Sequence, residues 1–317
     1  MYREAYAAAM GTTWAIYGAS LRWMLNSLAG DHIEIVKPRR KLPSVSGEVA
    51  VLPLHGVISQ RDSIWSELFG GTSTQQFGAG FAQAINDPRV KAVVLDVDSP
   101  GGTVAGVREL ADLVYQGSQQ KPVAAVANSQ MASAAYWIGS QVGGKLSRLA
   151  AAPGSDVGSI GVFRMHEDIS GKLEQEGVNV SFIAVPEFKT EANPFEPLSA
   201  EAEDHHMTQV QATYDQFVAD VARGRGASKA AVQNSYGKGR VYHADQAAQH
   251  GMVDRVATLP QMLAELGVGA KATLSQAQTE MMEELCHAWE TGLSAAIVPL
   301  PDPDFAREYA VKLRHYS

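Results

Sequence analysis

Residues Pro122-Val-Ala-Ala-Val-Ala127 lead directly into Asn128-Ser-Gln-Met-Ala-Ser-Ala-Ala-Tyr-Trp-Ile-Gly139, and the rest of the chain is organised around this stretch. The first segment is small, β-branched and uncharged, which predicts a short buried strand. A helix is expected to begin near Ser133, where unpaired backbone N–H groups and the positive end of the helix dipole converge. Such a position favours a tetrahedral oxyanion, which makes Ser133 a candidate nucleophile. An isolated serine in this place is more commonly a helix N-cap, so the neighbouring segments decide between the two interpretations.

The overall composition is that of an ordinary globular protein. The chain has 317 residues, of which 45% are hydrophobic and 19% are charged. The formal net charge of −8 argues against a nucleic-acid partner, because phosphate backbones attract basic surfaces. The single cysteine, Cys286, excludes an internal disulfide bond and a cysteine-rich metal site.

The N-terminal region is set apart from the rest of the sequence. Residues 2–28 are predicted to form an amphipathic helical arm, and the basic, proline-containing segment 37–47 follows as a connector. Arg22 and Asn26 interrupt the apolar part of the arm, so it is too short for a membrane span and unlike a secretory signal. We therefore expect a cytoplasmic protein without stable membrane insertion.

Three regions are expected along the chain. An N-terminal arm and linker occupy residues 1–46, a core occupies 47–258, and a helical extension with a loose tail occupies 259–317. The extension is helical from 259 to 289 and then becomes proline-rich at 299–303.

Within the core, predicted strands and helices alternate, which is typical of βαβ crossovers and a largely parallel sheet. The run from Val90 to Val97 is continuously apolar apart from Lys91 and Asp96, as expected of a strand buried on both faces. Strands are predicted at 48–58, 90–97, 122–127, 148–152, 160–164, 178–185 and 252–256. Helices are predicted at 77–85, from 103 to about 116, and at 133–141, 167–176, 199–223, 227–234 and 244–250.

Two glycine-rich segments lie where a serine nucleophile would need assistance. Asp98-Ser-Pro-Gly-Gly-Thr103 follows the carboxyl end of a buried strand, the position at which open α/β sheets bind their ligands. Its paired glycines let backbone N–H groups approach a substrate oxygen closely, although Pro-Gly-Gly is equally compatible with a simple tight turn. Gly154-Ser-Asp-Val-Gly-Ser-Ile-Gly161 supplies a further glycine-rich turn with two hydroxyl groups.

Taken together, these segments resemble the S49 family of serine peptidases, which comprises the signal peptide peptidase A group and its phage relatives. The resemblance implies an α/β fold of the crotonase/Clp-protease-like superfold, with repeated ββα units. One departure is that Ala134 and Ala135 stand where the family usually has glycines. The matching segments are Asp98-Ser-Pro-Gly-Gly102, Ala132-Ser-Ala-Ala-Tyr136, Gly158-Ser-Ile-Gly-Val162, Phe188-Lys-Thr190, Gly239-Arg-Val-Tyr-His-Ala-Asp-Gln-Ala247 and Gly251-Met-Val-Asp254.

The resemblance implies a Ser-Lys dyad, with Ser133 as nucleophile and Lys189 as general base. A neutral lysine amine can serve as base to a serine hydroxyl. Because an ordinary lysine has a pKa of about 10.4, the amine must lose roughly three pKa units, and burial among apolar groups is the usual cause. Phe188 and Phe195, close in sequence, offer such surroundings.

The same resemblance leads us to assign the remaining parts of the site. The backbone N–H groups of Gly102 and Ala134 form the oxyanion hole, and Gly101 supports the loop. The Ser159 hydroxyl orients the lysine amine. No metal ion and no cofactor is implied.

Three other interpretations are compatible with the sequence. The Clp-protease superfold also carries Ser-His-Asp triads, in which His166 would be the base, although its charged neighbours indicate a solvated position. An acyl-CoA hydratase or isomerase on the same superfold would need an acid/base carboxylate beside residues 133–136, and none is present there. An inactive scaffold protein that retains the fold is the third.

The expected function is endopeptidase cleavage through an acyl-enzyme. Because the arm lacks a membrane anchor, the resemblance favours the soluble phage forms, which process capsid, scaffold or portal-associated proteins in the host cytoplasm or prohead. A bacterial peptidase acting on signal peptides or membrane-protein fragments is the alternative. Family members assemble, so a homo-oligomer is expected, and the alanine-rich site favours small apolar residues on the acyl side of the cut bond.

Overall fold

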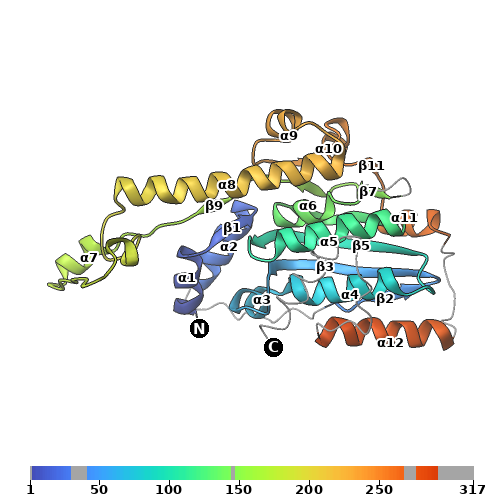
Figure 1. The fold of residues 1–317 in the computed structure, drawn as a ribbon, viewed down its shortest axis with the longest axis horizontal. Coiled ribbons are helices and arrows are strands. Elements are labelled where there is room, and N and C mark those ends of the chain that lie inside the picture. Colours follow the sequence, from blue (N-terminus) through green and yellow to red (C-terminus); the bar gives the residue numbers. More distant parts are fainter. Residues whose placement is uncertain (1, 30–40, 144–146, 268–275, 292–317) are drawn as a thin grey trace.

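The computed structural model describes residues 2–29, 41–143, 147–267 and 276–291 (Figure 1). The strands are β1 Thr13–Ile16, β2 Ser44–Ser46, β3 Val49–Ser59, β4 Gly71–Ser73, β5 Ala92–Thr103, β6 Val123–Ala132, β7 Arg148–Ala151, β8 Asp156–Gly158, β9 Phe163–Arg164, β10 Val241–His243 and β11 Arg255–Val256. The helices are α1 Tyr2–Met10, α2 Gly18–Ala29, α3 Ile64–Phe69, α4 Thr74–Asn86, α5 Val107–Gln120, α6 Ala134–Gly139, α7 Ser170–Gln175, the 3₁₀ helix η1 Glu187–Thr190, α8 Ala200–Arg225, α9 Lys229–Ser235, α10 Ala244–Gln249, α11 Leu259–Glu265 and α12 Gln276–Thr291.

The parallel sheet predicted from the sequence is confirmed. Strands β3, β5, β6 and β7 lie side by side and run parallel, with Val51 opposite Val94, and Leu95 opposite Ala125. Past the middle of the sheet the pairing changes. The end of β6 pairs with β8 as well as with β5, because Met131 lies opposite both Val157 and Ser99, and β8 in turn pairs with β10. The candidate site forms at these carboxyl ends of β5 and β6, where α6 follows β6.

The sheet is covered on both faces, which explains its continuous apolar strands. Alternate residues of β5 point to opposite sides: Val93, Leu95 and Val97 join a core with α4, α5, α6 and α8. Ala92 and Val94 face the smaller cluster built on α11. Figure 1 shows α4 and α5 lying across one face of the sheet. Burying a side chain of this size contributes roughly 1.5–3 kcal/mol, so both layers hold the sheet firmly.

The N-terminal arm, predicted to be helical, also contains a strand. It contains α1 and α2, but residues between them form β1, which enters the central sheet between β5 and β9. Gly11 and Gly18 flank this strand, and the extended backbone lets Trp14 donate a hydrogen bond from Nε1 to the Ala9 carbonyl. The arm and the core therefore share one sheet.

A projection leaves the body after β9 and returns along α8 (Figure 1). It contains α7, η1 and the first part of α8, whereas the last part of α8 is buried against the body from Phe217 to Gly224. The strand predicted at 178–185 is wrong. These residues have no neighbouring strand to pair with, and Ile183 and Val185 are 102% and 93% exposed.

The C-terminal helices pack on the core. α12 lies against α4, where the Trp289 and Phe77 rings meet edge to face at 5.3 Å. Helix α11 begins at a capping box between Thr258 and Gln261. The proline-rich tail at 299–303 lies outside the described residues. Among the helices of the described residues, none has the length and apolar character needed to cross a bilayer.

Candidate active site

Ser133 stands at the sharp turn between β6 and α6, in a strained backbone conformation. Its φ is 55° and its ψ is −117°, a region that residues with a Cβ rarely adopt. The backbone is held there from both sides: its N–H donates to the Gly158 carbonyl at 2.7 Å, and its carbonyl accepts from the Trp137 N–H at 2.9 Å. A serine forced into a strained strand-to-helix turn is the geometry of a nucleophile elbow.

The side chain of Ser133 is not used as a helix cap. It makes no capping hydrogen bond to α6, although the residue occupies the N-cap position. Its hydroxyl instead donates a long hydrogen bond of 3.4 Å to the Gly161 carbonyl. The hydroxyl is therefore available for chemistry, but the residue is 0% exposed, so something must move before an external substrate reaches it.

The Gly101–Gly102 turn at the end of β5 lies directly against the start of α6. A Cβ added to Gly101 would lie 3.0 Å from the Ala134 nitrogen, and one added to Gly102 only 1.8 Å from the Ile58 carbonyl oxygen. No side chain fits at either position. The Gly101 N–H is already bound by the Ser99 hydroxyl at 3.1 Å, and that hydroxyl donates to the Gly56 carbonyl at 2.6 Å. This arrangement fixes the turn and occupies the Gly101 N–H, so of the two glycines Gly102 is the candidate donor to a substrate oxygen.

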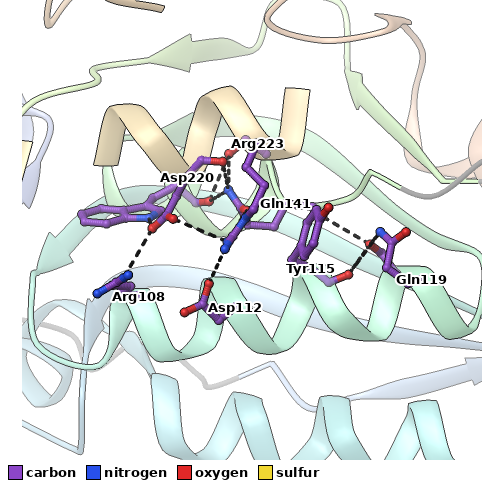
Figure 2. Close-up of polar contacts among 10 residues, drawn as sticks. Arg108, Asp112, Tyr115, Gln119, Gln141, Asp220 and Arg223 are labelled. Atoms are coloured by element: carbon purple, nitrogen blue, oxygen red, sulfur yellow. Dashed lines mark hydrogen bonds and ion pairs between the residues drawn. The ribbon is translucent and has the colours of Figure 1, made fainter. Parts of the chain in front are cut away.

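A buried polar network holds α6, and with it Ser133, in place (Figure 2). Trp137 donates from Nε1 to the Asp220 carboxylate at 2.9 Å, which ties α6 to α8. Arg223 bonds to the Gln141 side-chain oxygen at 2.8 Å and forms an ion pair with Asp112 of α5 at 2.7 Å. Burial raises the pKa of Asp220, an effect that the Trp137 hydrogen bond and the nearby Arg223 partly offset.

A second anchor joins α6 to the end of the core. The Tyr136 hydroxyl donates to the Met252 carbonyl at 2.8 Å, and complete burial raises the pKa of this phenol. Together with the network in Figure 2, this bond leaves α6 little freedom to shift. Rigid support of this kind is what a positioned nucleophile requires.

The sequence-predicted residues fall into two groups in space. Ser133, Ala134, Gly101 and Gly102 lie together, as the loop prediction required. Ser159 is adjacent, because it follows the Gly158 whose carbonyl binds the Ser133 N–H. It also has a positive φ of 54°, and its own N–H donates to the Arg240 carbonyl at 2.7 Å.

Lys189 lies elsewhere. It belongs to η1 on the projection, where it is exposed, and the projection carries it away from the body that contains α6 (Figure 1). The apolar surroundings expected from Phe188 and Phe195 are not formed within one chain, since both rings are themselves exposed. His166, the alternative base, lines a pocket of about 800 Å³ between α1, β9 and the start of α8, and Ser133 is not part of that lining.

A buried carboxylate in β5, the strand that ends in the glycine turn, was not predicted from the sequence. Asp96 of β5 is 0% exposed and is contacted by His55 at 3.2 Å, by Lys41 and by the Asn128 amide at 3.1 Å. Burial alone would raise its pKa, but hydrogen bonds and charges from His55 and Lys41 hold the pKa at about 2. The only signal in the sequence was a charged residue inside an apolar strand.

A parallel α/β sheet with a strained serine at a strand-to-helix turn is an arrangement typical of hydrolytic α/β enzymes. Comparison with known proteins identifies the family: residues 116–273 match Peptidase family S49. The chain therefore contains a peptidase S49 domain, as the sequence motifs indicated. The matched range includes Ser133, Ser159 and Lys189, and it begins after the Gly101–Gly102 turn.

Several curated proteins are similar over a longer part of the chain. Head-tail preconnector protein GP5 of Enterobacteria phage P21 is 34% identical over 220 residues, which is 69% of this chain and 42% of that protein. Capsid assembly protease C of Escherichia phage lambda is 30% identical over 212 residues, covering 67% and 47%. Protease 4 of Haemophilus influenzae is 26% identical over 270 residues, covering 84% and 42%. The chain thus spans less than half the length of these relatives.

Two solved protease structures are similar to part of the chain. A variant of the 1510-N membrane-bound stomatin-specific protease aligns with a TM-score of 0.43 and 14% identity, covering 72% of this chain and 86% of that one. A variant of ClpP1 from Listeria monocytogenes aligns with a TM-score of 0.38 and 12% identity, covering 67% and 94%.

Proposed function

We propose that this protein is a serine endopeptidase in which Ser133 is the nucleophile, Lys189 the general base, and the N–H groups of Gly102 and Ala134 the oxyanion hole. The observation that carries the proposal is the strained Ser133, whose hydroxyl is unused for capping and whose following residue, Ala134, lies against the glycine turn. Such donors act on the negative charge that develops on the carbonyl oxygen during attack.

The proposed reaction proceeds through an acyl-enzyme. The lysine amine takes the proton of the Ser133 hydroxyl as the oxygen attacks the peptide carbonyl carbon. The same proton then passes to the leaving amine. Water, activated by the same amine, then attacks the ester carbonyl and releases the acid and the free Ser133 hydroxyl. The base has to be a neutral amine, and burial of a lysine amine favours that form.

Because Lys189 is exposed on the projection, we infer that it acts on Ser133 of a second copy of the chain. The projection carries unusually exposed apolar side chains, among them Ile183, Val185 and Phe188 at 102%, 93% and 51%. Exposed apolar patches of this kind mark protein–protein contacts. Docking them on a neighbour would bury the amine beside them and complete the site, which supports a homo-oligomer.

The relatives support a proposal for the substrate class. Two of them are named for head-tail preconnection and capsid assembly in phages. We propose that this protein processes capsid, scaffold or portal-associated proteins during head maturation, in the host cytoplasm or prohead. Processing would depend on Ser133 in cells that co-express those proteins.

A mixing experiment tests the site. Ser133→Ala and Lys189→Ala should each be inactive toward a peptide substrate and fold normally. Mixed before assembly in equal amounts, they should regain about a quarter of the wild-type activity, because random neighbours pair an intact serine with an intact lysine at one site in four.

Lys172→Ala is the matched control, since Lys172 is an exposed lysine on the same projection whose ion pair with Glu176 has a distance of 4.0 Å. It should retain full activity. An active Ser133→Ala protein would refute the nucleophile. An active wild type with no recovery in the mixture would refute the contribution from a second copy.

A further inference from the structure

The N-terminal strand β1 lies beside the Gly101–Gly102 turn, which contacts the start of α6. It runs antiparallel to the end of β5 on one side, with Ala15 opposite Gly102, and antiparallel to β9 on the other, with Trp14 opposite Phe163. A short strand held between two others in this way has the geometry of a peptide bound by strand addition. Here the peptide is the chain itself.

The ladder places the Ala15 carbonyl at the proposed oxyanion hole. The Val104 N–H donates to the Thr13 carbonyl at 3.2 Å, and the Tyr17 N–H to the Pro100 carbonyl at 2.7 Å. In an antiparallel pair every second opposed pair is hydrogen-bonded, so the pair between these two, Ala15 and Gly102, is bonded as well. The Gly102 N–H therefore points at the Ala15 carbonyl.

The second proposed donor borders the same turn. A Cβ added to Gly101 would lie 2.2 Å from the Ala15 carbonyl oxygen and 3.0 Å from the Ala134 nitrogen, so both atoms lie against Gly101. β1 and β9 pair at Thr13–Arg164 and Trp14–Phe163, and continuing that register would set Gly161 opposite Ile16. Because the Gly161 carbonyl accepts from the Ser133 hydroxyl at 3.4 Å, the same continuation would set this hydroxyl near the residue that follows Ala15.

The side chains of β1 match this arrangement. Trp14 and Ile16 point into the cluster around Trp65, whereas Ala15 points the other way, into the main core that includes Ala134. Ala15 is 0% exposed. The space that receives the Ala15 side chain, on the acyl side of the proposed cut, is therefore filled by its single methyl group.

We propose that residues 13–16 occupy the substrate position of the site and that Ala15–Ile16 is a self-processing bond, the first that Ser133 cuts. This inference rests on the proposed peptidase function. It also offers a reason for the burial of Ser133, because the cut would release Thr13–Ala15 from the strand beside the Gly101–Gly102 turn.

The reaction balances without any further reactant except water. The Ser133 oxygen bonds to the Ala15 carbonyl carbon while its proton moves to the lysine amine, and the carbon–nitrogen bond to Ile16 breaks as that proton passes to the nitrogen. Water then attacks the ester, Ser133 recovers its proton, and Ala15 is left with a carboxylate. The products are residues 1–15 and a chain that begins at Ile16. Since the base comes from a second copy, cutting requires assembly.

Intact mass measurement and N-terminal sequencing of the full-length protein test the proposal. Wild type should accumulate a chain that begins at Ile16, at a rate that rises with protein concentration, and Ser133→Ala should not. Ala15→Leu should slow the cut at least about tenfold, because the pocket has no room for the larger side chain. Ala9→Leu is the matched control, since Ala9 is equally buried but lies in α1, and it should be cut normally.

If the Ala15→Leu protein misfolds, its slower cut would not report on the pocket. A free peptide substrate tests the same preference without changing the protein. The peptide Met10-Gly-Thr-Thr-Trp-Ala-Ile-Tyr-Gly-Ala-Ser20 should be cut between its alanine at 15 and isoleucine at 16, and the same peptide with leucine at 15 should be cut at least about tenfold more slowly.

The possible failures are distinguishable. If a fluorophosphonate probe labels Ser133 and other peptides are cut, while the Ala15–Ile16 bond stays intact in both chain and peptide, this inference alone is overturned. A cut that persists in Ser133→Ala overturns it too. If the probe does not label Ser133 and no peptide is cut, the proposed function falls together with it.

Discussion

Replacing Ser133 by glycine should stabilise the fold, although the same change destabilises most positions in strands and helices. Its φ of 55° and ψ of −117° cost a residue with a Cβ on the order of 1–3 kcal/mol and cost glycine almost nothing. The Ser133 hydroxyl contributes little stabilisation to offset this strain, because its hydrogen bond to the Gly161 carbonyl is 3.4 Å long. We therefore expect Ser133→Gly to exceed Ser133→Ala in free energy of unfolding by about 1–3 kcal/mol, since alanine keeps the strained Cβ.

Equilibrium urea unfolding, followed by circular dichroism, measures this difference directly. Thermal unfolding should show a Tm higher by roughly 2–4 °C for each kcal/mol. Ala134→Gly, one residue further on, is the control: its φ is not positive, so glycine there should lower stability by roughly 0.5–1 kcal/mol. A Ser133→Gly protein no more stable than Ser133→Ala would refute the strained turn. Both Ser133 variants should be inactive.

Three further predictions concern the surroundings of the site. Trp137→Phe should cost about 1–3 kcal/mol in urea unfolding, because it removes a hydrogen bond from the buried Asp220 carboxylate, and an unchanged midpoint would contradict the network. Asp96 has its folded pKa lowered to about 2, so it contributes stability above its unfolded value near 4 that is lost as pH falls from about 4 to 2. Asp96→Asn should lack that part of the acid slope in urea titrations, whereas an identical slope would argue against the pairing. If a lysine is the base, kcat/KM should rise toward alkaline pH, and a rate flat from about pH 5 to 9 would contradict a lysine base. His166→Ala should then retain most activity.

The central sheet could be predicted because each of its strands has a recognisable local sequence pattern. Nearly every residue in runs such as 90–97 and 122–127 is apolar. A strand needs such a run when both of its faces are buried. The segment 178–185 has equally β-prone residues but no neighbour to pair with, so pattern alone was misleading there. β1 was overlooked for the opposite reason: four residues inside an amphipathic helical pattern form a strand only because β5 and β9 leave a space for them.

The site was predictable in part for a similar reason. Ser133 and the Gly101–Gly102 turn end neighbouring parallel strands, and parallel strands bring their carboxyl ends to one edge. The conformation of Ser133 was not predictable, because the Gly158 carbonyl that fixes it is distant in sequence. The placement of Lys189 was not either, since it depends on the path of the projection.

The length of α8 has a consequence for how the protein can change over time. This helix has 26 residues, which makes it about 39 Å long, and its main buried stretch, Phe217 to Gly224, lies near its C-terminal end. The length of the helix sets both the distance and the direction of the projection. Each residue added or removed shifts the N-terminal end of α8, here called the tip, by about 1.5 Å and rotates it about the helix axis by about 100°. Insertions or deletions of about seven residues, two full turns, would keep η1 facing the same way, whereas a single-residue change would point it elsewhere. Variation in this segment should therefore come in whole turns, and the tip could reach its neighbour only at those discrete lengths.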